Sequence, residues 1–177
     1  MTADRIDTSA RGDLASRDDI VRLVDGFYGR VRVDSTLGPI FDGVARVDWG
    51  AHLPKMYDFW ESVLFGTAFF KGNPLAVHRA LARKTPMTNA EFGRWVVLFH
   101  TTVDELFAGP VASAAKDRHT LSETACELIV IEHRLRDVRR WTPETARAHL
   151  DVALSSVATA LDALHAEHTH RTTEQEQ

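Results

Sequence analysis

The sequence has little cysteine and few signals for β-structure. Cys126 is the single cysteine among 177 residues, so the chain has no intrachain disulfide and no cysteine cluster of the kind that binds zinc or an iron–sulfur cluster. Hairpin turns of the Asn-Gly type are absent, and Val31-Arg32-Val33 is too short to indicate a strand. Phosphate-cradling glycine loops and internal repeats are absent as well. These absences argue against disulfide-rich, β-sheet, nucleotide-binding and repeat proteins.

Two further absences concern the environment of the chain. No basic run stands out and the formal net charge is −4, which argues against nucleic-acid and anionic-membrane partners. No apolar run reaches 18 residues, and the segment from Met1 to Gly12 is polar and lacks an apolar signal core. The sequence therefore predicts a soluble, cytoplasmic protein.

The residues that are present favour an all-α protein with one main core. Hydrophobic residues make up 44% of the chain, enough to bury one substantial core. Periodic apolar stripes predict helices over about 17–33, 48–65, 74–81, 88–106, 111–139 and 142–164. Ser16 and Asp48 are expected caps, and Thr88 with Glu91 forms a capping-box pattern. The segment from Asp34 to Phe41 reads as a turn that ends in a buried Ile-Phe pair.

The stretch from Lys71 to Leu81 carries the first candidate functional residue. Asn73 is a good N-cap and Pro74 a good first helical residue, because proline lacks the N–H that would be unbonded there. On the short helix that follows, His78 lies between Leu75 and Leu81 on the apolar stripe. A histidine in this setting is either a core residue or a ligand, and a neutral imidazole that faces aromatic side chains is typical of the proximal ligand of haem iron.

Four motifs, in order along the chain, carry a resemblance to a known family. They are Phe27-Tyr28-x-x-Val31-Arg32-x-Asp34-x-x-Leu37-Gly38-Pro39-Ile40-Phe41, Trp49-x-x-His52 with Phe59-Trp60, Gly72-x-Pro74-Leu75-x-x-His78, and Phe92-x-x-Trp95-x-x-Leu98-Phe99. Together they resemble the group III truncated haemoglobins over about residues 16 to 110. The resemblance implies a two-over-two helical sandwich around a haem b (iron protoporphyrin IX). The Cys-x-x-Cys-His pattern is absent, so the haem would be held non-covalently.

The resemblance also divides the chain and assigns residues. Residues 1–15 are expected to be a flexible tail, 16–140 the haem domain, and 141–177 a helical extension with a polar tail from His165. His78 maps to the proximal iron ligand, while Tyr28 and Trp95 map to the distal side, where a phenol O–H and an indole N–H can donate to a bound ligand. Each such bond would contribute roughly 1.5–3 kcal/mol if the ligand carries negative charge.

The remaining candidates line the expected pocket. His52 lies on the distal helix and either donates to the ligand, gates its entry or ligates the iron; we favour the gate. Met56 and Phe59 share the face of His52 by helical spacing and are expected to wall the haem. Phe41 is expected to pack on the porphyrin edge, whereas Trp60 and Phe99 read as core. The haem propionates need cations at the rim, for which Arg79, with Lys55 and Arg83, is a candidate.

Three classes of function remain open at this point. The first is a haem protein that reversibly binds dioxygen, nitric oxide or carbon monoxide, for redox or detoxification chemistry rather than bulk oxygen transport. The second is a haem peroxidase or nitric oxide dioxygenase, which would need a separate reductase because the chain has no flavin or nicotinamide motif. The third is a helical interaction module without a cofactor.

The C-terminal segment has no counterpart in the resemblance. Its stripe of Leu150, Leu154, Val157, Leu161 and Leu164 is too apolar to stay in water, since burying one such side chain contributes roughly 1.5–3 kcal/mol. The helix either folds back on the helix before it or pairs with a second copy of itself. We favour a homodimer through this C-terminal helix.

Overall fold

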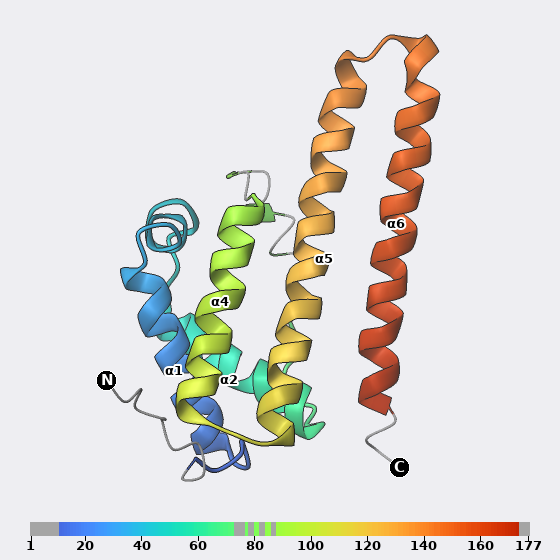
Figure 1. Cartoon of the computed structure of the whole chain (residues 1–177). Helices are drawn as coiled ribbons and strands as arrows, with labels where there is room; N and C mark the ends of the chain where they lie inside the picture. The colour runs from blue at the N-terminus through green and yellow to red at the C-terminus, as the bar shows by residue number, and fades with distance from the viewer. Residues whose placement is uncertain (1–10, 73–76, 78–79, 82–83, 86–87, 174–177) are drawn as a thin grey trace, which may run out of the picture.

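The computed structural model describes residues 11–72, 77, 80–81, 84–85 and 88–173. The helices are α1 (Arg17–Val33), η2 (Pro39–Ala45), α2 (Trp49–Phe65), α4 (Asn89–Leu106), α5 (Pro110–Trp141) and α6 (Glu144–Thr173), and η2 is a π-helix. Within the described ranges the chain contains no β-strand. This arrangement confirms the all-α prediction (Figure 1).

The helix ends that the sequence predicted are formed by the expected caps. The Ser16 side chain accepts a hydrogen bond from the Asp19 N–H at the start of α1, and Asp48 caps α2 in the same way. Thr88 and Glu91 form a complete capping box at the start of α4. Gly66 ends α2 with a φ of 70°, a left-handed conformation that a residue with a Cβ adopts with strain. These ends depend on local chemistry, which explains why the sequence predicted them.

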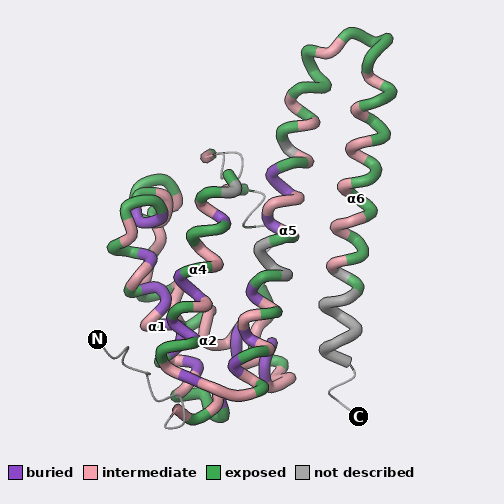
Figure 2. The backbone as a smooth tube through the Cα atoms, in the orientation of Figure 1, coloured by how far each residue is buried: buried purple, intermediate pink, exposed green. Residues whose placement is uncertain are grey.

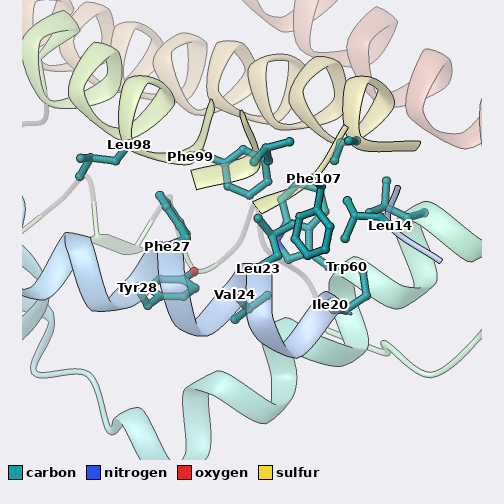
Figure 3. Close-up of a cluster of buried hydrophobic side chains, with 14 of the residues drawn as sticks. Leu14, Ile20, Leu23, Val24, Phe27, Tyr28, Trp60, Leu98, Phe99 and Phe107 are labelled. Carbon is teal, nitrogen blue, oxygen red and sulfur yellow. The ribbon is translucent and has the colours of Figure 1, made fainter. Parts of the chain in front are cut away.

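The part of the chain that resembles a globin, which we call the globin part, contains four long helices among its described residues. Helix α1 packs against both α2 and α4, α4 packs against α5, and α2 also contacts α5 (Figure 1). This is the two-over-two sandwich that the resemblance implied. Its core is a single large cluster, to which α1 contributes one face and α4 another (Figure 3). Fully buried members include Leu23 and Phe27 of α1 and Phe99 and Val103 of α4.

The turn after α1 differs from the expectation. Residues 39–45 form the π-helix η2 rather than an open turn, and Ile40 and Phe41 are half-buried rather than buried. Leu37, just before them, is the buried residue of this segment. Close packing also explains Gly38, because a Cβ there would collide with the carbonyl oxygen of Arg32. The Ile-Phe pair therefore remains available to line a neighbouring surface.

The prediction of a flexible segment over residues 1–15 is wrong for its last five residues. Leu14 is buried in the main core, and the Asp13 carboxylate accepts hydrogen bonds from the N–H groups of Val111 and Ala112, at 2.9 and 2.7 Å. Asp13 thereby caps α5, whose first residues follow Gly109 with its φ of 151°. A cap supplied from nearly one hundred residues away leaves no local signal. Residues 1–10 lie outside the part that the structure describes.

The C-terminal helices form a hairpin that extends beyond the globin part. Helix α5 ends at Trp141, the chain turns at Thr142 and Pro143, and α6 runs back antiparallel along α5 (Figure 1). This is the fold-back alternative, whereas pairing with a second copy remains a proposal. The polar residues from His165 onward, expected as an irregular tail, continue α6 as far as Thr173. No helix in the described part is both long and apolar enough to cross a membrane.

Removing the long-range cap should weaken the globin part measurably. We expect Asp13→Ala to lower the free energy of unfolding by about 1 kcal/mol, the usual cost of losing an N-cap. Urea unfolding followed by circular dichroism measures the change. Asp117→Ala, at an exposed position on the same helix, is the matched control and should change stability by less than about 0.5 kcal/mol. Equal effects of the two substitutions would show that Asp13 does not act as a cap.

Candidate functional site

The candidate site is centred on Tyr28, which lies on the buried face of α1 and is only 5% exposed. Besides its neighbour Phe27, four aromatic rings surround it: Phe41 from η2, Trp49 and His52 from α2, and Trp95 from α4. The ring centroid of His52 is 5.2 Å from that of Tyr28, and that of Trp95 is 5.9 Å away. The structure thus brings together four residues predicted separately from the sequence, and it adds Trp49.

Phe41 lies between two tryptophans and orders the outer side of this group. Its ring stacks on Trp95 at 4.8 Å and 8°, and on Trp49 at 6.0 Å and 22°. The Trp49 indole N–H already donates to Asp42 at 2.7 Å, and the Arg32 guanidinium lies 5.1 Å from its ring centroid. Trp49 therefore has its polar group engaged elsewhere and contributes an apolar wall to the site.

His52 carries a buried polar atom that has no partner in the described part of the chain. Its Nε2 is buried and makes no hydrogen bond. Burial, with a smaller contribution from Lys55, lowers the pKa of His52 below its ordinary value of 6.5, so the imidazole is neutral at pH 7. An unpaired buried nitrogen costs roughly 1–3 kcal/mol. A ligand or water in the space beside Tyr28 would remove that cost.

Other predicted wall residues lie further along α2. Met56 and Phe59 are half-buried and pack against the main core. Phe59 makes edge-to-face contacts with Trp60 and Phe70, at 5.4 and 5.2 Å between ring centroids. Trp60 is buried and stacks on Phe99 at 4.8 Å, so both are core residues, as the sequence indicated. Met56 and Phe59 continue the wall of α2 that begins at His52.

The predicted proximal side falls outside the described residues. His78, the expected iron ligand, lies there together with Arg79 and Arg83, two of the three candidate cations. The third cation, Lys55, is exposed on α2. Within the described part no group of three His, Cys, Asp or Glu side chains is placed to hold a metal ion.

His119 of α5 is a site residue that the sequence analysis did not single out. It is 4% exposed, and neither of its ring nitrogens has a hydrogen-bond partner among the residues that the structure describes. Its ring stacks on Phe99 at 3.9 Å and 4°, and Trp60 and Trp95 lie nearly parallel to it at 6.1 and 6.2 Å. Burial, reinforced by nearby His100, lowers the pKa of His119 to about 3, so this imidazole is neutral. Trp95 links it to the group around Tyr28.

The sequence signal for His119 was weak because its helix has two competing stripes. The spacing of Leu121, Ala125, Leu128 and Leu135 predicts that their face of the helix is buried. Ala125, Leu128 and Leu135 are only half-buried, and the side chain of Leu121 lies outside the described part. The buried face instead begins with small or polar residues, Ala112, Ala115, His119 and Cys126, and continues with Ile129 and Val130. The helical spacing of His119 with Ala112 and Ala115 could have indicated this face. Leucines are more hydrophobic than alanines, however, so the leucine stripe determined the predicted buried face. The structure therefore corrects the choice of the buried face of α5.

Comparison with known proteins now decides the family. No family model matches the sequence. The group 3 truncated haemoglobin Ctb of Campylobacter jejuni is 32% identical over 95 residues, a match that covers 52% of this chain and 72% of that protein. The chain belongs to the group 3 truncated haemoglobins. A crystal structure of group III truncated haemoglobin from Campylobacter jejuni has the same fold, with a TM-score of 0.60 and 24% identity.

Membership of the truncated haemoglobins makes this a globin-type haem protein. The structural match covers 94% of the Campylobacter jejuni chain but 68% of this one, so about a third of this chain has no counterpart there. The residues around Tyr28 fit a haem pocket in their chemistry. They form an apolar aromatic wall with a buried unpartnered nitrogen on His52, and burial keeps both His52 and His119 neutral. Such a wall suits a large apolar ring whose ligands are neutral gases.

The buried imidazole of His119 should make this truncated haemoglobin sensitive to acid. In the unfolded chain His119 titrates near pH 6.5, whereas in the folded protein it stays neutral down to about pH 3. Below pH 6.5 the unfolded state therefore binds one proton more, and the folded state loses stability as the pH falls towards 3. His119→Phe should reduce the fall in unfolding free energy by up to about 1.4 kcal/mol per pH unit between about pH 6 and pH 4.

Urea unfolding at a series of pH values, followed by circular dichroism, measures this slope. His149, which is exposed on α6, provides the control, and His149→Gln should leave the slope unchanged. A wild-type slope in His119→Phe would contradict a neutral buried imidazole at position 119.

Proposed function

We propose that this protein binds haem b through His78 and reversibly binds dioxygen and other diatomic gases for redox or detoxification chemistry rather than bulk oxygen transport. The observation that carries the proposal is the group formed by Tyr28, His52 and Trp95. Three side chains capable of donating a hydrogen bond, from three different helices, meet within an apolar aromatic wall. One of them, His52, has a buried nitrogen without a partner.

The cofactor would be held by residues on both sides of this group. His78 is the proposed iron ligand, and its second nitrogen would donate to a backbone carbonyl that sets the tautomer. Phe41, Met56 and Phe59 would pack against the porphyrin, and the Arg79 guanidinium would pair with a propionate. Haem, when bound, supplies the iron to which a gas ligand attaches.

Tyr28 and Trp95 would hold the ligand by hydrogen bonds made in a dry setting. A phenol O–H and an indole N–H would donate to a ligand that carries negative charge, and each bond would be worth roughly 1.5–3 kcal/mol. Because Tyr28 is 5% exposed, water competes little for its hydroxyl. Two such donors make release slow, which suits chemistry on the bound ligand better than delivery of oxygen.

His52 is the proposed gate of the pocket. Its ring lies edge-on to both Tyr28 and Trp49, with centroids 5.2 and 5.9 Å away. Unlike Tyr28, His52 is only half-buried, so its side chain has access to solvent on one side. Pro54 follows two residues later inside α2 and removes a backbone donor from that turn. A neutral ring at the edge of the pocket can swing outward without a charge penalty, which favours gating over fixed ligation or donation.

Membership of a haem-protein family argues against the cofactor-free interaction module. Peroxidase or nitric oxide dioxygenase activity fits the same donors, because both chemistries act on a haem ligand that gains charge. Either activity consumes electrons, for which we propose a separate reductase as partner. We place the protein in the cytoplasm, where such a reductase and its nicotinamide supply would be at hand.

The iron ligand is the decisive assignment to test. We expect the wild-type protein loaded with haem to show a Soret band that shifts between its ferric, ferrous, oxy and carbonmonoxy forms. His78→Gly should keep its helical circular dichroism but lose haem or bind it weakly, because it removes the nitrogen proposed to bind the iron. Imidazole added to the variant should restore part of the spectrum. A His78→Gly protein with wild-type spectrum and haem affinity would overturn the assignment.

The two distal donors can be tested by rates of ligand release. Tyr28→Phe and Trp95→Phe should each speed dioxygen dissociation at least about tenfold, since 1.4 kcal/mol corresponds to a factor of ten. Carbon monoxide, which carries little charge when bound, should respond less. Stopped-flow ligand replacement measures both rates.

Trp49→Phe is the matched control for this pair. Trp49 contacts the same tyrosine, but its N–H is engaged by Asp42, so its loss should leave dioxygen dissociation within about threefold of wild type. Equal effects of a substitution on dioxygen and carbon monoxide would indicate a steric role instead of hydrogen bonding.

A further inference from the structure

The hairpin formed by α5 and α6 has apolar residues that the chain itself does not bury. From residue 131 to the end of α6, none of the residues whose burial is described is buried (Figure 2). The stripe of α6 that faces α5 is only half-buried, although it consists of Leu150, Leu154, Val157, Leu161 and Leu164. In a hairpin of two helices, each helix covers apolar side chains on only one side of the other, and the remaining sides stay in contact with water. Helical bundles usually solve this problem by adding further helices to the same core.

Part of the hairpin surface is apolar and faces outward. Ile131 and Val138 are 43% and 55% exposed, and their spacing of seven residues places them on one face of α5. Trp141, at the end of the same helix, is 90% exposed. A tryptophan and two β-branched residues in water at the end of a projecting hairpin indicate a contact surface.

The charges on the hairpin are separated along its length. Five arginines and two acidic residues lie between positions 134 and 147, around the tip. Three glutamates and no basic residue lie between 123 and 132, in the part of α5 nearer the globin domain. Two acidic residues, three histidines and no lysine or arginine lie between 158 and 170 of α6, which runs beside that part of α5 (Figure 1). We call these regions the basic tip (134–147) and the acidic base (123–132 with 158–170).

Intramolecular ion pairs use only part of this charge. Arg139 pairs with Asp151 across the hairpin, and Arg136 pairs with Glu132 on α5. Arg140 reaches Asp137 only at 3.7 Å, and its side chain is largely exposed. The tip therefore keeps a surplus of positive charge that the turn itself does not neutralise.

We propose that two copies of this chain associate hairpin to hairpin in antiparallel orientation, forming a four-helix bundle in which the basic tip of each copy lies along the acidic base of the other. In a dimer with a two-fold axis this contact occurs twice, once for each tip. The charge pattern of one hairpin is therefore complementary to that of an identical, antiparallel hairpin. Tip-to-tip association would instead bring ten arginines of two tips together, which costs free energy through like-charge repulsion. The half-buried leucines of both hairpins would then share one core.

The same arrangement leaves the haem pocket free. The residues around Tyr28 come from α1, η2, α2 and α4, and His119 lies nearer the start of α5, whereas the proposed contact uses α5 from residue 123 onward together with α6. The two globin domains would lie at opposite ends of the bundle. We therefore expect substitutions in the hairpin to change dimer formation without changing ligand binding, and substitutions in the pocket to do the reverse.

Sedimentation of the full-length, haem-loaded protein tests the association. We expect a dimer at micromolar concentration that dissociates more readily as salt increases, because salt screens the charges. Reversing the tip with Arg136→Glu and Arg140→Glu should raise the dimer dissociation constant at least tenfold, and reversing the base with Glu127→Lys and Asp162→Lys should do the same. The four substitutions combined should restore dimerisation. Arg46→Glu, in the loop after η2, is a matched control that should leave it unchanged.

Spin labels at position 141, in a protein with Cys126→Ala and Trp141→Cys, test the orientation. With about 20 residues of overlap and 1.5 Å per residue, antiparallel hairpins place the two labels roughly 30 Å or more apart. A short distance between labels would show tip-to-tip pairing and overturn the proposal. A monomer at high concentration, or a dimer unaffected by either charge reversal, would overturn it too. The absorption spectrum of every variant should match wild type, which separates this outcome from any failure at the haem site.

Discussion

The packing of α1 against α4 is the contact on which the candidate site depends. Phe27 and Tyr28 are neighbours in sequence, but their side chains have different roles. Phe27 is edge-to-face with Phe99 and Trp95 at 5.2 and 4.8 Å, and so ties the two helices together. Tyr28 thereby comes to lie against Trp95. Burial of the Phe27 ring contributes roughly 1.5–3 kcal/mol, and without it the two proposed donors would have no fixed separation.

The same core also contains buried polar atoms of two histidines. His52 Nε2 and both nitrogens of His119 are buried without hydrogen-bond partners in the described part of the chain, and each such nitrogen costs free energy. If packing were the only requirement, leucine or phenylalanine at either position would make the folded state more stable. Unsatisfied buried groups in folded proteins usually have a functional explanation. Here His52 lies against Tyr28 and His119 lies nearly parallel to Trp95, both of them residues of the candidate site, which is consistent with membership of a haem-protein family.

The hairpin of α5 and α6 obeys a different physical constraint from the globin part. In the globin part four helices cover one another and bury a continuous cluster, whereas in the hairpin each helix has one neighbour (Figure 2). A stripe of leucines packed on one side only gains less from the hydrophobic effect than a core residue does. Because arginines lie at the tip and acidic residues at the base, the charge of the exposed surface changes sign along the hairpin.

The sequence by itself determined the features that depend on neighbouring residues. The caps at Ser16, Asp48 and Thr88 involve side chains within three residues of the backbone groups they satisfy, so they could be predicted. The family, and with it the roles proposed for Tyr28, Trp95 and His78, followed from the spacing of motifs. The existence and type of the long helices followed from apolar periodicity, which is strong over segments of this length.

Only the tertiary structure decided what depends on residues far apart. Asp13 caps a helix that begins nearly one hundred residues later, and no local pattern announces such a pair. The buried face of α5 carries alanines and His119 rather than leucines, because the globin core takes small side chains there while the leucine stripe is left half-buried beside α6. The sequence allowed the last helix either to fold back or to find a second copy. The turn at Thr142 brings α6 along α5, because a leucine stripe pairs first with the nearest apolar surface that its own chain supplies.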